Sequence, residues 1–160
     1  MLRLTCLAAA LFGSAAADTT FFLKPLEGKT DGPELALVLI QGATCPTEGY
    51  RGLAEALQKA SPYKLWVGVP EFVLNTPEPA EYGFAFDGII KRMKEAGMKA
   101  DKTVIGAHSL GAVMSQIYLS SSLLGKGKAD ALVLMGATVL RSNRPNNYPM
   151  ESNSYSGGIQ

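Results

Sequence analysis

The sequence is poor in the residues that bind metals and form disulfides. Its 160 residues include one histidine, His108, and two cysteines, Cys6 and Cys45. These residues form no cluster with the spacing of a known metal site, so we expect no metal, and no motif indicates another cofactor. Cys6 lies in an N-terminal segment that we expect to be removed. Cys45 is then either a small buried apolar residue or the partner of a cysteine beyond this chain.

An excess of charge of either sign is also lacking. The chain has 15 Lys and Arg residues against 14 Asp and Glu residues, a formal net charge of +1. Proteins that follow a phosphate backbone carry a basic stripe, often interleaved with aromatic residues, and this sequence has neither. We therefore expect no nucleic acid partner. The composition, 47% hydrophobic and 18% charged, is typical of a globular domain.

The N-terminal apolar stretch, Leu4–Phe12, is about nine residues long and falls short of the roughly 20 residues of a transmembrane helix. The small residues Ala15 and Ala17 follow it and suit cleavage by signal peptidase after Ala17. We expect residues 1–17 to be a signal peptide and the protein to be secreted with no stable membrane anchor. An uncleaved anchor is the alternative.

Apolar runs without polar alternation recur at intervals of about thirty residues and predict strands that are buried on both faces. These runs are Leu35–Ile40, Leu65–Val69, Val104–Ala107 and Ala131–Met135. Between them lie segments with helical periodicity, at about 47–60, at about 84–96 and from the residue after Ser109 onward. Alternation of strand and helix predicts an α/β fold with a doubly wound, mostly parallel sheet. Phe21–Leu23 is expected to add an antiparallel edge strand.

The periodicity also predicts which side chains each helix buries. In the first helix it places Tyr50, Leu53, Leu57 and Ala60 on the buried face and Gln58 on the solvated face. In the third helix it buries Val113, Met114, Ile117, Tyr118 and Leu119. We expect residues 18–141 to form one domain, and residues 142–160, which are rich in Asn, Ser, Pro and Gly, to be a polar tail.

One strand-to-helix junction carries a catalytic pattern, Ala107-His108-Ser109-Leu110-Gly111. It follows a predicted buried strand and precedes a predicted helix, which places Ser109 at a sharp corner. Small residues two positions before and two positions after a serine permit such a corner, where a hydrolase exposes its nucleophile. The alternative is an ordinary turn in which the glycines serve only packing.

From Leu35 to Leu140, the order of elements and this corner resemble the α/β-hydrolase family, especially secreted lipases, esterases and chlorophyllase-like or dienelactone-hydrolase-like members. The resemblance implies that Ser109 attacks a carboxylic ester and forms an acyl-enzyme. It implies oxyanion-hole N–H groups at Leu110 and at Ala43, where Gln41-Gly42-Ala43 is similar to the His-Gly motif of lipases. A glycine turn that merely closes a strand is the other interpretation of Gly42.

The resemblance covers only the N-terminal portion of the family's domain. The family's acid and histidine follow later strands, and nothing after Leu134 matches them. His108 precedes the serine and is expected to point away from it. We therefore expect a partial domain that ends after the strand following the nucleophile helix, with a small-molecule ester as substrate and little activity of its own. A non-catalytic relative that binds an apolar ligand or a protein partner, the latter through its exposed sheet edge, is the alternative.

Overall fold

All four apolar runs form parallel strands of one sheet in the computed structural model, which describes residues 18–29 and 32–143. The expected signal peptide and nearly all of the expected tail lie outside the described residues. The elements in chain order are β1 (Phe21–Leu23), β2 (Glu34–Ile40), α1 (Arg51–Ala60), β3 (Lys64–Val69), α2 (Pro79–Glu95), β4 (Lys102–His108), α3 (Leu110–Ser120) and β5 (Ala131–Met135). A short 3-10 turn, Thr47–Tyr50, leads into α1.

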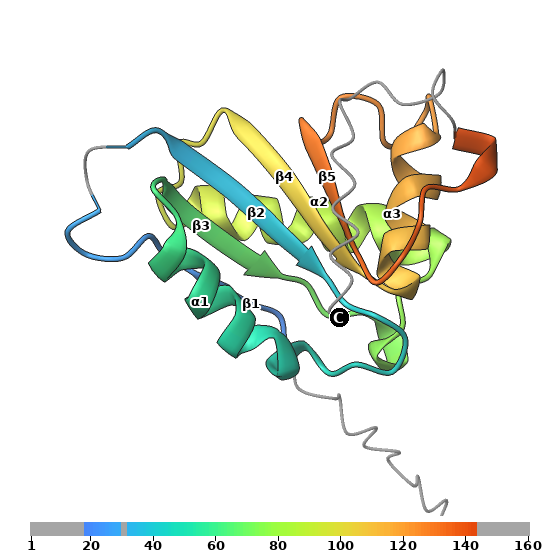
Figure 1. The fold of residues 1–160 in the computed structure, drawn as a ribbon, viewed down its shortest axis with the longest axis horizontal. Helices are drawn as coiled ribbons and strands as arrows, with labels where there is room; N and C mark the ends of the chain where they lie inside the picture. The colour runs from blue at the N-terminus through green and yellow to red at the C-terminus, as the bar shows by residue number, and fades with distance from the viewer. Residues whose placement is uncertain (1–17, 30–31, 144–160) are drawn as a thin grey trace, which may run out of the picture.

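The sheet has the strand order β1-β3-β2-β4-β5 (Figure 1). Strand β1 pairs antiparallel with β3, as the sequence predicted, and the other strands are mutually parallel. Because β2 and β4 are parallel neighbours, their carboxyl ends lie side by side at the same end of the sheet, with Ile40 opposite Ala107. The α/β fold with a mostly parallel sheet is therefore confirmed.

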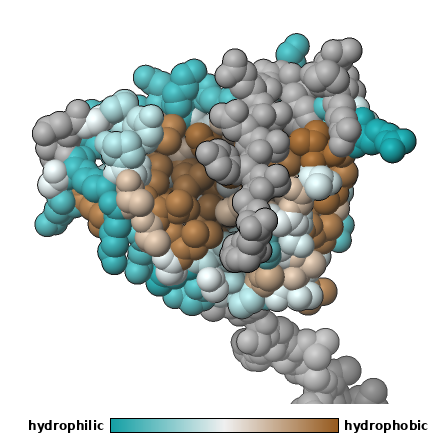
Figure 2. All heavy atoms as spheres, in the orientation of Figure 1, coloured by the Kyte–Doolittle hydropathy of each residue, from teal (hydrophilic) through white to brown (hydrophobic). Residues whose placement is uncertain are grey.

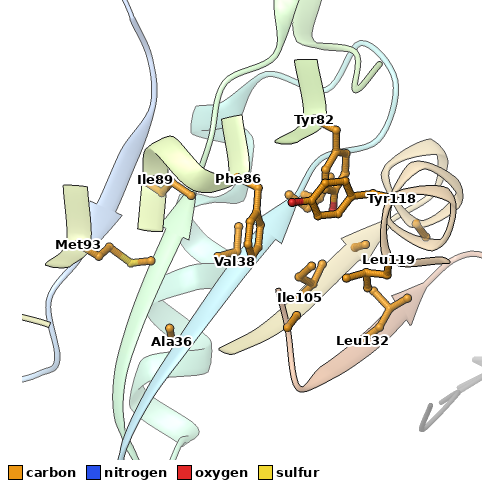
Figure 3. Close-up of a cluster of buried hydrophobic side chains, with 14 of the residues drawn as sticks. Ala36, Val38, Tyr82, Phe86, Ile89, Met93, Ile105, Tyr118, Leu119 and Leu132 are labelled. Carbon is orange, nitrogen blue, oxygen red and sulfur yellow. The ribbon is translucent and has the colours of Figure 1, made fainter. Parts of the chain in front are cut away.

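Helices α2 and α3 cover one face of the sheet, and α1 lies on the other (Figure 1). Alternate residues of β2 serve the two faces, since successive strand side chains point in opposite directions. Val38 joins the core beneath α2 and α3, whereas Leu37 and Leu39 join the core beneath α1. Figure 3 shows Phe86 of α2 close to Val38.

The predicted buried face of α1 is partly wrong. Gln58, expected in solvent, is buried, because its Nε2 donates hydrogen bonds to the carbonyl oxygens of Lys24 and Leu65, each 2.8 Å away. Ala54 packs fully into the core, whereas Leu53 is 39% exposed and Ala60 is exposed. Ala54 and the Gln58 amide therefore take the buried positions, and Leu57 packs half-buried beside them.

The other two helices also differ in detail from the sequence predictions. Helix α2 begins at Pro79, five residues earlier than expected, with proline at the first helical position where its missing N–H costs no hydrogen bond. In α3, Tyr118 and Leu119 are buried as predicted, but Ile117 is exposed and Val113 and Met114 are only half-buried. Small and polar residues take the buried positions there, namely Gly111, Ala112, Ser115 and Gln116. They allow α3 to lie close to the strands.

Helix α1 covers its face of the sheet incompletely. Figure 2 shows hydrophobic residues gathered in the middle of this face. The described residues of this face enclose hollows of about 420 and 290 Å³. The smaller is lined by Leu35, Leu57 and Val104 among others, and the larger is near the carboxyl ends of the strands, at His108 and Met135. Among the described residues, no helix is long and apolar enough to span a bilayer.

Candidate active site

Ser109 occupies the corner between β4 and α3 and has a strained backbone. Its φ of 50° and ψ of −120° lie outside the regions that residues with a side chain ordinarily adopt. Its N–H donates a hydrogen bond to the carbonyl oxygen of Met135 on the neighbouring strand, at 2.9 Å. The residue itself is exposed. The corner therefore presents the serine to solvent at the carboxyl edge of the sheet, in the conformation expected of a nucleophile elbow.

Steric crowding around the corner explains its small residues. A Cβ on Gly111 would lie 2.3 Å from the carbonyl oxygen of Gln41, and a Cβ on Gly106 would lie 2.9 Å from Leu39. Ala107 is fully buried. These contacts agree with the sequence argument that larger side chains here would strike the neighbouring strand or loop.

The turn after β2 lies directly against the corner. A Cβ on Gly42 would lie 3.2 Å from Ser109 Cβ and 2.9 Å from His108 Nδ1. The structure thus brings the Gln41-Gly42-Ala43 turn and Ser109 together, although Gly42 and Ser109 are 67 positions apart in the sequence. Ala43, the residue after this contact, is exposed.

Among the described residues, the backbone N–H groups of Gly42 and Thr44 are hydrogen-bonded, whereas that of Ala43 between them is not. The Gly42 N–H donates to Tyr50 Oη at 2.9 Å, and the Thr44 N–H donates to Thr76 Oγ1 at 3.2 Å. No described residue accepts a hydrogen bond from the Ala43 N–H. Leu110 is the first residue of α3, where a backbone N–H has no partner within the helix. Both N–H groups are therefore available to a ligand.

His108 belongs to a different network from Ser109. Its Nδ1 is 2.8 Å from Tyr50 Oη, which also accepts the Gly42 N–H. Burial raises the pKa of Tyr50, and the thiol of Cys45 beside it raises that pKa further, while the bond from Gly42 lowers it. Tyr50 therefore keeps its hydrogen at neutral pH, and we expect it to donate that hydrogen to His108 Nδ1. In that arrangement the imidazole carries its own hydrogen on Nε2.

Sequence analysis missed the role of Tyr50, which it treated only as part of an apolar face. It also missed Met135 and Thr76, whose contacts depend on the packing of distant segments. Gln41 is fully buried, and no described residue hydrogen-bonds its side-chain amide. Cys45 is a free, half-buried thiol. Among the described residues, no three His, Cys, Asp or Glu side chains are grouped as metal ligands.

Neither a protein-family model nor a curated protein sequence matches this chain. Among solved structures, it is similar to esterase 2 of Thermogutta terrifontis, phosphonylated by cyclosarin, with a TM-score of 0.51 and 13% identity. The match covers 82% of this chain and 56% of the esterase. A probable hydrolytic enzyme of Pseudomonas aeruginosa matches with a TM-score of 0.48 and 16% identity, over 72% of this chain and 36% of that enzyme.

A further match is an α/β-hydrolase enzyme from the sediment metagenome of the Mar Chica lagoon, Morocco, with a TM-score of 0.46 and 15% identity. It covers 80% of this chain and 53% of that enzyme, so the chain spans between about a third and just over half of these three proteins. At such low identity the likeness shows the fold alone. The chain has the α/β-hydrolase type of fold over most of its length and corresponds to only part of the matched proteins.

Proposed function

We propose that Ser109 is the nucleophile of a serine hydrolase that acts on carboxylic esters. The observation that carries this proposal is the strained, exposed backbone of Ser109 at the β4–α3 corner. Strain at a residue with a side chain persists only where the surrounding structure enforces it, and such residues cluster at functional sites. Here the enforcing contacts are the hydrogen bond to Met135 and the close approach of Gly111 to Gln41.

The chemistry follows from the groups around the serine. Ser109 Oγ attacks the acyl carbon of the ester, and the carbonyl oxygen becomes an oxyanion. The free N–H groups of Ala43 and Leu110 stabilise this oxyanion, because backbone donors fixed in place need no reorganisation. A base takes the Ser109 proton during the attack and passes it to the departing alcohol, which leaves the acyl group bonded to Ser109 Oγ. The same base then takes a proton from water, which attacks the acyl-enzyme and releases the acid as the proton returns to Ser109. The esterase-like fold supports a small-molecule ester as the substrate.

We further propose that the base and its acid partner are supplied by residues that follow this chain in a longer protein. His108 is the single histidine of the chain, and Tyr50 holds its Nδ1. Removal of a triad histidine lowers turnover by about a million-fold and leaves roughly 10³- to 10⁴-fold over water. The 160-residue chain should therefore be nearly inert.

Labelling with a fluorophosphonate probe and hydrolysis of 4-nitrophenyl butyrate test this proposal. We expect the 160-residue chain to do both hardly above background, and a version continued through the following coding sequence to do both well. Ser109→Ala in the longer version should abolish both signals. Ser120→Ala, at the exposed end of the same helix, is the matched control and should retain them. Activity that survives Ser109→Ala contradicts the proposal.

A non-catalytic protein that keeps the fold and binds an apolar ligand is the second candidate. The engagement of the only histidine by Tyr50 favours it. A longer version that carries no further histidine and stays unlabelled at Ser109 would support this candidate over the enzyme.

We also propose that the protein is exported and that residues 1–17 are removed. The support is the short apolar stretch followed by Ala15 and Ala17. N-terminal sequencing of exported protein should give Asp18 as the first residue, and an intact Met1 on the exported form contradicts the proposal.

A further inference from the structure

The turn that carries Ala43 has a backbone conformation that its sequence does not favour. Residues 42–45 form a β-turn, in which the Cys45 N–H donates a hydrogen bond to the Gly42 carbonyl oxygen at 3.3 Å. Thr44, the third residue of this turn, has a φ of 57°. A turn with a left-handed third residue ordinarily has glycine or asparagine there, and a β-branched residue such as threonine rarely adopts that conformation. A contact from outside the turn is therefore needed to hold Thr44 in place.

The loop after β3 provides that contact. The Thr44 N–H donates a hydrogen bond to Thr76 Oγ1 at 3.2 Å. The Thr76 hydroxyl in turn donates to the Leu74 carbonyl oxygen, also at 3.2 Å. Because a hydroxyl has a single hydrogen, the bond to Leu74 leaves the lone pairs of Thr76 Oγ1 to accept the Thr44 N–H. A side chain 32 positions further along the chain thus holds the peptide between Ala43 and Thr44.

The loop that carries Thr76 is itself fixed in place. Phe72 and Pro77 are buried on either side of it, and the Val73 N–H donates a hydrogen bond to Glu81 Oε2 on α2, at 3.2 Å. Strained backbone collects in this loop and in the segments beside it. Apart from glycines, the described residues with a left-handed φ are Thr44, Leu74, Asn75 and Ser109. Such strain persists only where the surrounding structure enforces it, and it is typical of functional sites.

We propose that Thr76 is a positioning residue that fixes the Ala43 N–H beside Ser109. The inference rests on the proposed function, in which this N–H stabilises the oxyanion. Backbone donors assist a reaction because they are already oriented before the charge develops. Without the Thr76 hydroxyl, the peptide between Ala43 and Thr44 is free to turn over, which gives Thr44 the negative φ that threonine prefers. Ala43 then changes its own backbone angle, and its N–H loses its fixed place.

Three substitutions isolate the Thr76 hydroxyl. Thr76→Val keeps the shape of the side chain and removes the hydroxyl, whereas Thr76→Ser keeps the hydroxyl and is the rescue variant. Thr20→Val is the matched control. Thr20 Oγ1 likewise accepts a backbone N–H of the loop after β3, that of Glu71 at 2.9 Å, but it does so at the start of the loop.

The first measurement is the NMR spectrum of the full 160-residue chain, which reports the conformation of the turn. In a turn with a left-handed third residue, Ala43 Hα lies close to the Thr44 amide hydrogen. We expect a strong nuclear Overhauser effect between these two hydrogens in the original chain, in Thr76→Ser and in Thr20→Val. In Thr76→Val this effect should weaken, and the effect between the amide hydrogens of Ala43 and Thr44 should strengthen.

The second measurement is the rate at which a fluorophosphonate labels Ser109 in the same chains, followed by mass spectrometry over many hours. Ser109 Oγ bonds to phosphorus, fluoride leaves, and the serine proton passes to hydroxide from the solution. The phosphonyl oxygen takes the place of the oxyanion. A serine hydrolase without its base keeps a residual reactivity that comes from the oxyanion donors and from binding, so this slow reaction depends on the Ala43 N–H. We expect labelling about tenfold slower in Thr76→Val, and within about twofold of the original rate in Thr76→Ser and Thr20→Val.

Several results would overturn the proposal. Equal labelling rates in the original chain and Thr76→Val would do so while leaving Ser109 as the nucleophile. An unchanged turn in Thr76→Val, or slow labelling in Thr76→Ser, would also reject the role of the hydroxyl. Equal slowing in Thr20→Val would trace the effect to the loop as a whole. Failure to label Ser109 in both the 160-residue chain and the longer version rejects the proposed function itself, whereas the NMR measurement needs no reaction and still shows whether Thr76 holds the turn.

Discussion

Gly111 lies so close to Gln41 that a Cβ at position 111 would stand 2.3 Å from the Gln41 carbonyl oxygen. No real Cβ approaches an oxygen so closely. The first turn of α3 and the end of β2 are therefore in backbone contact, and this contact fixes the turn that carries Ala43 beside the corner that carries Ser109. The absence of a side chain at Gly111 thus allows the turn with Ala43 and the corner with Ser109 to lie side by side.

Gly111→Ala should destabilise the protein, because either β2 or α3 must move to admit the methyl group. We expect a loss of about 2–4 kcal/mol in the free energy of unfolding, measured by urea denaturation. Gly52→Ala is the control in an open helical position and should raise stability by up to about 1 kcal/mol. Equal effects of the two variants would show that the contact between Gly111 and Gln41 is easily relieved.

Tyr50→Phe should destabilise the protein, because the Tyr50 hydroxyl joins the Gln41-Gly42-Ala43 turn to His108. It removes the acceptor of the Gly42 N–H and the hydrogen-bond partner of His108 Nδ1, both at a buried position, at a cost of about 1–3 kcal/mol. Because His108 is the only histidine, nitrogen NMR reports its tautomer without assignment. We expect the Nε2–H form in the original chain and a mixture of forms in Tyr50→Phe. An Nδ1–H form in the original chain contradicts the donor assignment.

The fold could be predicted from the sequence because a strand that is buried on both faces of a sheet consists of an uninterrupted run of apolar residues. Runs such as Leu65–Val69 need only be uniformly apolar to predict parallel strands, and the corner at Ser109 depends on steric limits within a few residues. The side chains of α1 were harder to place. Gln58 is buried because its amide finds two acceptors, one of them on Lys24, and hydrophobic periodicity contains no information about such partners.

The candidate site could be predicted only in part, because some of its contacts join residues that are far apart in the sequence. Ser109 and its small neighbours form one local pattern. The contact between Tyr50 and His108 joins residues 58 positions apart, because the turn that ends at Tyr50 reaches the last residue of β4. The cavity beside them likewise arises from the partial cover that α1 gives the sheet. Neither feature has a sequence signal of its own.

Strand β5 should promote self-association of the isolated 160-residue chain. Among the described residues it pairs only with β4, and Val133 in its middle is 37% exposed. An apolar edge strand offers unpaired backbone groups to another chain, and lysine on such an edge opposes pairing. We expect the original chain to form oligomers or to be poorly soluble. Val133→Lys should restore the monomer. Leu123→Lys, which changes an exposed loop residue away from this strand, is the control and should not. Light scattering measures the mass, and a monomer at all concentrations refutes the prediction.

Tyr82 should make the protein sensitive to alkaline pH. It is fully buried, and its Oη lies 2.6 Å from Ser115 Oγ, which donates to the Gly111 carbonyl oxygen. Because Ser115 uses its own hydrogen on Gly111, Tyr82 is the donor to Ser115 and must keep its proton. Burial raises the pKa of Tyr82 well above the value of 10.0 that an exposed tyrosine has. The neighbouring Tyr118 is affected similarly, since burial and the charge of Asp87 raise its pKa to about 12.

The sign of the pH effect follows from these pKa values. Below about pH 10 tyrosine is protonated in both the folded and the unfolded chain, so it adds no pH dependence. Above pH 10 the unfolded chain loses the Tyr82 proton while the folded chain keeps it, and the free energy of unfolding falls by up to about 1.4 kcal/mol per pH unit for this one group. Urea denaturation between pH 8 and pH 11 should show this decline in the free energy of unfolding.

Tyr82→Phe should be less stable than the original chain at pH 8, but its free energy of unfolding should fall less steeply above pH 10. Tyr63→Phe, at an exposed position, is the control and should show the same fall with pH as the original chain. Parallel declines in the original chain and Tyr82→Phe would mean that the Tyr82 hydroxyl ionises within the folded protein, in conflict with its burial against Ser115.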